Sequence, residues 1–524
     1  MREQALYYKS DINPWVVAFI VSIVAFMEVL DTTITNVSLS HIAGSLGATN
    51  EESTWVLTSY LVANGIILPI SGWLANVIGR KQYFILCIIG FTGASFACGS
   101  ATSLPMLIIF RVIQGLAGGG LQPTQQAIIL DAFPPEKRAA AFAVTGVTMV
   151  LAPIIGPTLG GLITDNFSWR WIFYINIPVG VITLFLINRV VHTQPHTVAR
   201  GFKNIDYIGL SLASLGLGAL QMVLDRGQIE DWFNSHFIIF LMAVSVASIV
   251  TAVIWILRRE DPIIDIRLLN DKGFGLSFVL IFITGFFLYS SAVMLPILLQ
   301  TQFSYDATLA GLVLSPGGLA AICLMPISAK LLSQFQAKYV VIIGFLLCTF
   351  GMYNSSLITP TTDYNTFVFI RITQVLGIPF LFIPLSIIAF KNIHKDQNNK
   401  ASALYSMARN LGGSFGIALM TTLVTRKEQE WQAYLNQNTS AYNPVLQDRV
   451  AEITRLIIAR GGDPASAQQQ ALGKVYQEMI SQASFLAYHD AFTLLMYMAL
   501  GFAICACFLP KNHPKANIDI PAAH

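Results

Sequence analysis

The sequence predicts an all-α integral membrane protein with about fourteen transmembrane helices in the order six, two and six. Three observations predict this class. Hydrophobic residues make up 54% of the chain, charged residues make up 11%, and the mean hydropathy is +0.62, outside the balance of a soluble domain. Apolar runs of roughly twenty residues, long enough to cross a bilayer, follow one another along the chain. Short motifs of the first part recur at a nearly constant spacing in the last part.

Each expected span is an apolar run bounded by polar or basic turns. The first run, residues 15–39, is too long for the apolar core of a signal peptide and has no clear cleavage site, so we expect it to remain as a helix. The cysteines fall inside expected spans, where they behave as small apolar residues and indicate neither disulfides nor a metal site. The approximate centres of the spans are residues 26, 65, 92, 118, 150, 180, 216, 245, 285, 320, 348, 378, 412 and 497.

The basic residues predict the orientation of the chain. If the N-terminus is cytoplasmic, most Lys and Arg residues of the short connections fall on the cytoplasmic side, and the short outer loops contain only Arg170 and Arg226. By the positive-inside rule, both termini are then cytoplasmic. The polar segment after the thirteenth span is exempt, because long loops translocate largely regardless of charge.

Two pairs of motifs indicate an internal repeat. Residues 69–74 (PISGWL) recur as residues 326–331 (PISAKL), and Arg111-x-x-Gln114 recurs as Arg371-x-x-Gln374. The offsets, 257 and 260 residues, map the second span onto the tenth and the fourth onto the twelfth. Parallel repeats of this kind build secondary transporters that bind substrate between two halves, near the membrane midplane.

The repeat divides the chain into segments, and one insertion stands out. The polar segment 426–484 is expected to form a long periplasmic loop between spans 13 and 14. It exceeds an ordinary connection, so it is either an interaction surface or an insertion without a partner. The expected segments are a cytoplasmic tail (1–13), an N-terminal six-helix bundle (14–191), a linker with two extra helices (192–272), a C-terminal six-helix bundle (273–510) and a cytoplasmic tail (511–524).

The first span carries two carboxylates on one face. Glu28, Asp31, Thr32 and Thr35 follow one another at i, i+3, i+4 and i+7. A carboxylate inside the bilayer is costly unless it is neutralised, paired or hydrated, and such residues usually mark an ion or proton path. The alternative is that either acid lies near the aqueous end of the helix and only caps it. Arg111, inside the fourth span, needs an acceptor, and the two acids are the candidates.

Six motifs, taken as a set, are typical of one transporter family. They are residues 30–37 (LDTTITNV), 55–60 (WVLTSY), 72–81 (GWLANVIGRK), 111–115 (RVIQG), 156–161 (GPTLGG) and 169–178 (WRWIFYINIP). This set resembles the signature of the major facilitator superfamily and, more narrowly, of the 14-span drug:proton antiporters of the EmrB/QacA type. The resemblance extends over nearly the whole chain, is densest in the first six spans, and implies the major facilitator fold.

For the turn after the second span, the resemblance implies a gating role for Gly72, Asn76, Gly79, Arg80 and Lys81. Gly72 allows close approach of a neighbouring helix, and the basic pair holds the turn on the cytoplasmic side. The alternative is that the turn is only a topology anchor. The family usually has an acid where this chain has Asn76, so we expect a weaker cytoplasmic closure, or one supplied by other residues.

In the fifth span, Gly156, Pro157 and Gly160 allow tight, kinked packing, and the resemblance identifies them as the antiporter motif, which favours export. For Arg111, the resemblance implies a role in proton transfer. The alternative is a purely structural ion pair between the first and fourth spans.

Candidate substrate contacts are polar or aromatic residues in the expected spans. Phe282, Phe286 and Tyr289 form a stripe that either stacks on a lipophilic substrate or faces lipid and neighbouring helices. Gln122 and Gln125 lie on the same predicted helix face as Arg111. The full set of candidates is Thr35, Asn64, Gln122, Gln125, Phe282, Phe286, Tyr289 and Gln374.

The resemblance implies a proton-coupled multidrug efflux transporter that exports amphipathic or lipophilic compounds by alternating access. Burial disfavours a charged carboxyl and Arg111 favours it, so a rocking motion that changes either contact changes proton affinity. In double-membraned bacteria, such exporters lie in the inner membrane and work with a periplasmic adaptor and an outer-membrane channel, and residues 426–484 are placed to touch the adaptor. No cofactor or nucleic acid is expected, and the sequence has no Gly-x-x-x-x-Gly-Lys phosphate loop.

Two alternatives remain from the sequence. One is an exporter of a specific endogenous metabolite, such as a fatty acid or a siderophore. The other is a non-transporting membrane receptor or scaffold, which would tolerate Asp31→Asn and Arg111→Ala. An enzyme is not expected, because neither membrane face has a nucleophile with a base or a cluster of metal ligands.

Overall fold

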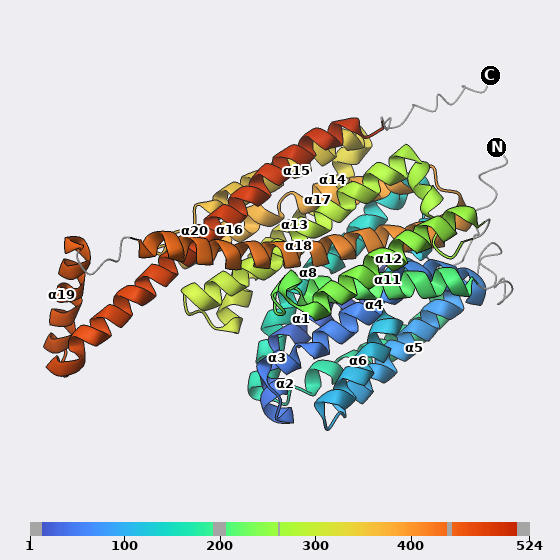
Figure 1. The fold of residues 1–524 in the computed structure, drawn as a ribbon. Helices are drawn as coiled ribbons and strands as arrows, with labels where there is room; N and C mark the ends of the chain where they lie inside the picture. Colours follow the sequence, from blue (N-terminus) through green and yellow to red (C-terminus); the bar gives the residue numbers. More distant parts are fainter. Residues whose placement is uncertain (1–12, 192–205, 260–261, 438–442, 511–524) are drawn as a thin grey trace, which may run out of the picture.

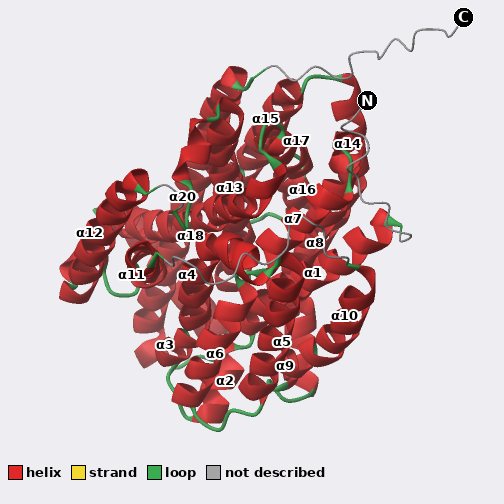
Figure 2. Cartoon of the chain, turned by 90° about the vertical axis from the view of Figure 1, so that its right-hand side faces the viewer, coloured by secondary structure: helices red, strands yellow, loops and turns green. Residues whose placement is uncertain are grey.

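The computed structural model describes residues 13–191, 206–259, 262–437 and 443–510, and these ranges form helices without a strand (Figure 2). Thirteen helical segments of the described chain are long and apolar enough to cross a membrane. The fourteenth expected span is α18, whose buried face is rich in glycine and small polar residues, which lower its hydropathy and let helices pack closely. The predicted fold class, an all-α membrane protein of six, two and six spans, is confirmed. Most of both predicted tails, and the linker residues 192–205, lie outside the described residues.

The N-terminal half begins at a capped helix. The side chain of Asn13 accepts a hydrogen bond from the backbone of Trp15, and Pro14 occupies the first turn, where a missing N–H costs nothing. The fourth span is divided in two at Gly119 and Gly120. The helices of this half are α1 (Pro14–Val37), α2 (Leu39–Leu46), α3 (Asn50–Ser53), α4 (Trp55–Ile78), α5 (Arg80–Gly99), α6 (Leu104–Gly118), α7 (Leu121–Ala132), α8 (Pro135–Asn166), α9 (Trp171–Tyr174) and α10 (Asn176–Val190).

The extra pair and the C-terminal half follow. The extra helices are α11 (Tyr207–Arg226) and α12 (His236–Arg258); the short helix η3 (Trp232–Asn234) lies between them, and η4 (Ile266–Asn270) follows α12. The C-terminal helices are α13 (Lys272–Gln302), α14 (Ala307–Gln334), α15 (Ala337–Ser356), α16 (Tyr364–Val375), α17 (Ile378–Phe390), η5 (Lys395–Gln397), α18 (Asn398–Asn436), α19 (Pro444–Ala459), α20 (Pro464–Cys505) and η6 (Ala506–Phe508).

The two halves pack their helices in the same way. In the first half α1 packs on α8, α4 on α6, and α5 on α10; in the second half α13 packs on α18, α14 on α16, and α15 on α20. The halves meet along two seams, α8 against α14 and α4 against α18. The extra helix α11 packs on α12 and lies along the second seam, in contact with both α4 and α18 (Figure 1).

The segment expected as a long periplasmic loop is largely helical. α18 continues beyond the bundle to Asn436, and α20 runs without a break from Pro464 to Cys505. Between them α19 folds back on the start of α20, where Val450 and Ile453 bury their side chains against Ala471. Figure 1 shows α19 standing away from the helix bundle.

Candidate functional site

Asp31 and Arg111 form an ion pair in the interior of the N-terminal half. The Arg111 Nη1 atom donates to Asp31 Oδ2 at 2.5 Å, and both side chains are inaccessible to solvent. The other carboxylate oxygen, Oδ1, accepts from Asn176 at 2.7 Å and from Gln114 at 3.1 Å. Because both oxygens have partners, this carboxylate is held in one position.

The surroundings of Arg111 fix the guanidinium as well. Its Nε donates to the carbonyl of Val56 at 3.1 Å, and Nη1 also donates to Gln114 at 2.8 Å. The ring of Tyr60 lies 4.3 Å from the guanidinium carbon, a cation–π distance. Only Nη2 has no hydrogen-bond partner. The predicted partnership of Arg111 with an acid of the first span is therefore with Asp31.

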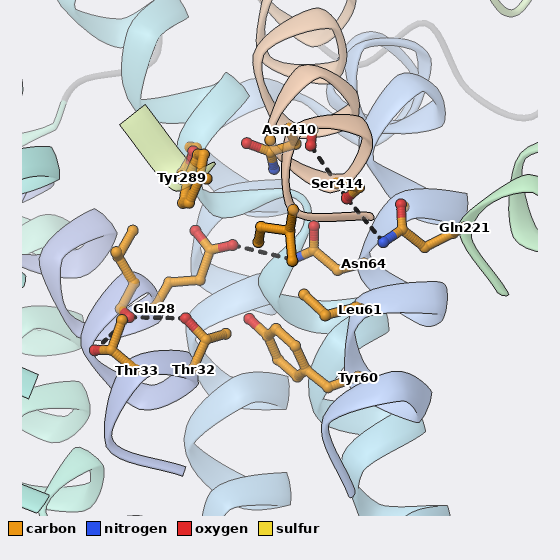
Figure 3. Close-up of a pocket in the computed structure, with 15 residues that line it drawn as sticks. Glu28, Thr32, Thr33, Tyr60, Leu61, Asn64, Gln221, Tyr289, Asn410 and Ser414 are labelled. Atoms are coloured by element: carbon orange, nitrogen blue, oxygen red, sulfur yellow. Dashed lines mark hydrogen bonds between the residues drawn. The ribbon is translucent and has the colours of Figure 1, made fainter. Parts of the chain in front are cut away.

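Glu28 occupies a different environment, one helical turn away. It lines a cavity of about 130 Å³ between the two halves (Figure 3). Its Oε1 accepts from Asn64 at 3.0 Å, whereas Oε2 is buried without a hydrogen-bond partner. The cavity is lined by Glu28, Val29, Thr32, Thr33, Tyr60, Leu61, Asn64, Gly65, Gln122, Gln221, Tyr289, Asn410, Gly413, Ser414 and Ile417. Glu28 is the carboxylate of this set, so it is the acid that a small cationic ligand or a proton would meet first.

A second buried arginine lies beside the cavity. Arg409 of α18 is 2% exposed and donates through Nη2 to the Gln122 side chain of α7. Its Nε and Nη1 atoms have no hydrogen-bond partner, and no carboxylate of the described residues forms an ion pair with it. Gln122 also lines the cavity with Glu28. The Gln122 side-chain amide therefore borders the cavity and accepts the hydrogen bond from Arg409 of the C-terminal half.

The motif residues after the second span lie where α4 meets the start of α18. A Cβ atom on Gly72 would be 2.5 Å from the carbonyl oxygen of Asn399, so only glycine permits this approach. The Asn399 side chain donates to Asn76 at 2.6 Å and accepts from Arg80 Nε at 2.6 Å. Arg80 also forms an ion pair with Asp131. The bonds of Asn399 to Asn76 and Arg80 thus cross this end of the seam, and the ion pair fixes Arg80 within the N-terminal half.

The other motif residues have distinct positions. Gly79 adopts φ 95°, a conformation that favours glycine, and Lys81 donates to the carbonyl of Asn188 at 2.7 Å. In α8, Cβ atoms on Gly156 and Gly160 would meet Thr33 and Ile34 of α1, and Pro157 stands inside the helix between them. These residues therefore bring α8 close to the helix that carries both acids.

Three of the predicted substrate contacts line the cavity, namely Asn64, Gln122 and Tyr289. The others lie elsewhere. Thr35 donates to the carbonyl of its own helix at Asp31, Gln125 donates to Ser22 at 3.0 Å, and Gln374 belongs to a separate network. Phe282 packs on Phe415 and Phe286 on Phe287, so two of the three residues in the aromatic stripe contact other rings rather than the cavity.

The separate network stands in the C-terminal half. Arg371 is 2% exposed, and its Nη1 donates to Gln374 at 3.1 Å and to Ser291 at 3.4 Å. Gln374 in turn donates to Ser355 at 2.9 Å. This network repeats the arginine and the glutamine of the Asp31 site without its carboxylate.

Sequence reasoning missed Arg409, Gln221, Asn410 and Ser414 as site residues. An arginine inside an expected span is itself a signal, since buried cations in membranes are rare, and that signal would have found Arg409. The other three are common polar residues, and only the packing of α11 and α18 turns them toward the cavity.

The family model described as the Major Facilitator Superfamily matches residues 21–417. The chain is 35% identical to the multidrug export protein EmrB of Escherichia coli K12, over 90% of both chains, and 34% identical to the fatty acid resistance protein FarB of Neisseria gonorrhoeae, over 89% of this chain and 90% of the relative. The structure of the proton:xylose symporter XylE superposes with a TM-score of 0.58 at 13% identity, over 96% of this chain and 97% of that chain, which indicates a shared fold.

Proposed function

The chain belongs to the major facilitator superfamily, as an EmrB-type multidrug efflux transporter rather than an enzyme, and we propose that it exchanges amphipathic or lipophilic compounds for protons. The observation that carries this proposal is the pair of acids on α1. Asp31 is fully paired in a dry site, and one turn away Glu28 presents an unpartnered oxygen in the cavity between the halves.

We propose different roles for the two acids, Glu28 and Asp31. Glu28 takes up a proton or faces a cationic substrate, because a buried carboxylate with a free oxygen is stabilised by either. Asp31 and Arg111 position α1 against α6, and rocking of the half that changes their burial changes the proton affinity of this region. Competition between proton and substrate at one cavity then gives antiport.

Alternating access requires that contacts between the halves open at one end at a time. The seam between α4 and α18 offers such contacts at the start of α18, where Asn399 binds Asn76 and Arg80, and Asn398 donates to Asp131 at 3.1 Å. Farther along α18, Ser406 donates to Gln126 at 3.2 Å. We propose that this end faces the cytoplasm, with both termini cytoplasmic, and that the protein resides in a bacterial inner membrane.

Substrate-induced proton release in proteoliposomes tests the proposal. A lipophilic cation such as tetraphenylphosphonium should release protons from the wild type. Glu28→Gln should abolish the release because the cavity loses its carboxyl, and Asp31→Asn should abolish it because Arg111 loses its counter-ion. Thr35→Ser, which alters a neighbouring residue outside the cavity, should leave the release unchanged. Equal release by all four proteins would contradict the assignment of coupling to α1.

A second candidate function is export of an amphipathic anion. It is favoured by Arg409, a buried cation beside the cavity with two unpartnered nitrogens, and by the similarity to a fatty acid resistance protein. Accumulation of a medium-chain fatty acid in cells that lack the transporter, reversed by the wild type but not by Arg409→Gln, would support it. Unchanged fatty acid levels would contradict export of an amphipathic anion and leave multidrug export as the remaining candidate function.

A tripartite assembly is the third part of the proposal. The helix α19 and the first turns of α20 stand away from the bundle on the side opposite the start of α18 (Figure 1). Such a surface is placed to contact a periplasmic adaptor, which would continue to an outer-membrane channel. Replacing residues 437–463 by a short Gly-Ser linker should abolish recovery of the adaptor in a pull-down, whereas transport into proteoliposomes should persist. Recovery at the wild-type level would overturn this role.

A further inference from the structure

The extra helix α11 forms one wall of the cavity. Gln221 lines the cavity and is 5% exposed. Figure 3 shows Gln221 and Glu28 on opposite sides of Asn64. The Gln221 side chain passes α4 at Gly65, where a Cβ would lie 3.7 Å from Gln221 Cγ. A Cβ alone would fit at this distance, whereas a side chain longer than that of alanine would occupy the path, so a small residue here gives a helix outside both halves access to the site between them.

Gln221 retains hydrogen-bonding capacity in this position. Its Nε2 donates to Ser414 Oγ at 2.9 Å. A side-chain amide has a second N–H and a carbonyl oxygen with two lone pairs. Beside it, the amide of Asn410 also lines the cavity, and its Oδ1 accepts only a long 3.5 Å bond from Arg409. This wall therefore offers neutral donors and acceptors, in contrast to the carboxylate on the opposite wall.

α11 is fixed to the N-terminal half. Thr58 of α4 donates to Asp225, Arg226 donates to Thr54 at 2.7 Å, and its guanidinium lies 4.6 Å from the ring centre of Trp55. These are charged or charge-assisted contacts, which are stronger than bonds between neutral groups.

The contacts of α11 and η3 with α18 are neutral hydrogen bonds. They are the bond from Gln221 to Ser414 and a bond from Trp232 to Thr422 at 2.9 Å. They follow, along α18, the bonds of Asn399 and Arg409 to the N-terminal half. α11 thus stands at the surface where the two halves must part.

We propose that Gln221, together with Asn410, is a substrate-binding subsite for a neutral hydrogen-bonding group, a hydroxyl or an amide, on an amphipathic cation. The inference rests on the proposed function, because it adds a contact to the same cavity. The substrate hydroxyl binds the second N–H or the carbonyl oxygen of Gln221, which the bond to Ser414 leaves free, so the bond between α11 and α18 persists when the subsite is filled.

The experiment compares two cations that differ by one hydroxyl, tetraphenylphosphonium and its mono(4-hydroxyphenyl) analogue, by calorimetric titration of the purified full-length protein. The wild type should bind the hydroxylated cation more tightly. Gln221→Met, which keeps the length of the side chain, should weaken binding of that cation about three- to tenfold, the effect of one lost hydrogen bond, and leave tetraphenylphosphonium unchanged. Gln334→Met, on the exposed end of α14, is the matched control.

Unchanged binding of tetraphenylphosphonium by Gln221→Met also shows that the variant is folded. A preference for the hydroxylated cation that survives Gln221→Met, or an equal loss for both cations, overturns the subsite. Proton release with the same two cations separates this inference from the proposed function. If the wild type binds both cations as expected but releases no protons, the subsite is supported and proton coupling is contradicted. If the wild type releases protons with both cations and Gln221→Met does not change the preference for the hydroxylated cation, proton coupling is supported and the subsite is contradicted.

Discussion

Two buried arginines occupy equivalent places in the two halves, and the residues that accept their hydrogen bonds differ in charge. Arg111 and Gln114 recur 260 residues later as Arg371 and Gln374. At the same offset, Asp31 corresponds to Ser291, and each of these residues accepts a hydrogen bond from the arginine of its own half. Both halves therefore contain the arginine and the glutamine, and only the N-terminal half contains the acid at this position.

Under the proposed function, the difference locates the charge that would change during transport. In the N-terminal half a carboxylate compensates the guanidinium, so protonation of that carboxylate alters the net charge of the site. In the C-terminal half Arg371 has neutral partners, and its Nε has no hydrogen-bond partner. Under the proposed function, the second site therefore provides a fixed charge and the first is the site at which a proton would act.

The largest expected effect is that of removing each arginine. Arg111→Ala leaves Asp31 buried without a counter-ion, which should cost about 3–5 kcal/mol of unfolding free energy. Arg371→Ala leaves no charge uncompensated, so its cost should be clearly smaller. Denaturant or thermal unfolding in detergent, with Asp31→Asn/Arg111→Gln as the variant that removes both charges, measures the difference. Equal losses for the two single variants would show that the halves are not distinguished by the ion pair.

An added acid should make the halves more alike. Ser291→Asp places a carboxylate beside Arg371, and we expect a gain of about 1.5–3 kcal/mol, the value of a hydrogen bond to a charged group. The matched control is Ser290→Asp, one residue earlier, where Ser290 Oγ binds its own helix at Phe286 and lies beside Gly416. That variant should be destabilised. Loss of stability in both would mean that burial of the new carboxylate outweighs its contact with Arg371.

The two halves also use equivalent glycines in helix packing. Gly156 and Gly416 are 260 residues apart and pack α8 on α1 and α18 on α13. A Cβ on Gly416 would meet the Ser290 hydroxyl at 2.5 Å and the backbone oxygen of Phe286 at 2.6 Å, and a Cβ on Gly156 would meet the Thr33 hydroxyl and, at 2.6 Å, the Thr33 Cβ atom. Gly416→Ala and Gly156→Ala should therefore each cost about 1–3 kcal/mol of unfolding free energy. Gly161→Ala, where the nearest atom is 3.5 Å away, should be nearly neutral in the same unfolding assay.

The smallest expected effect is at the contact between the halves. Asn76→Asp would place a negative charge near the first residues of α18, and an acid there should stabilise the contact by about 0.3–1 kcal/mol. Its counterpart at the offset of 257 residues is Ser333, which is exposed, so Ser333→Asp should have no such effect. Slower transport by Asn76→Asp alone would agree with this expectation. Equal rates in both variants would show that this end of α18 does not limit the cycle.

Composition and motifs predicted the fold, because membrane spans require long apolar runs and the repeat preserves Arg-x-x-Gln in both halves. The motif set also identified the family correctly. Asp31 was among the predicted partners of Arg111 because few acids lie inside spans. The choice between Glu28 and Asp31 could not be made, since both share a helix face and only packing places Asn176 and Gln114 around one of them.

The cavity itself was beyond sequence reasoning. Its wall on α11 depends on the small residue at Gly65 and on how the extra pair lies along the seam. α18 has a low hydropathy for a membrane span because its buried face contains glycine and serine, which allow close packing of helices. Residues 444–459 form a helix that packs on α20 through a few apolar contacts, and the hydropathy pattern does not predict these contacts.

The unbroken length of α20 has a mechanical consequence. Its 42 residues extend about 60 Å, roughly twice the hydrocarbon thickness of a bilayer, and α19 is packed on the end that leaves the bundle. The helix is thus a lever whose fulcrum lies where it enters the bundle. A tilt of about 10° during the transport cycle would swing the α19 end by roughly 5 Å, given a projecting arm of about 30 Å. Movement inside the membrane would in this way become displacement well outside it.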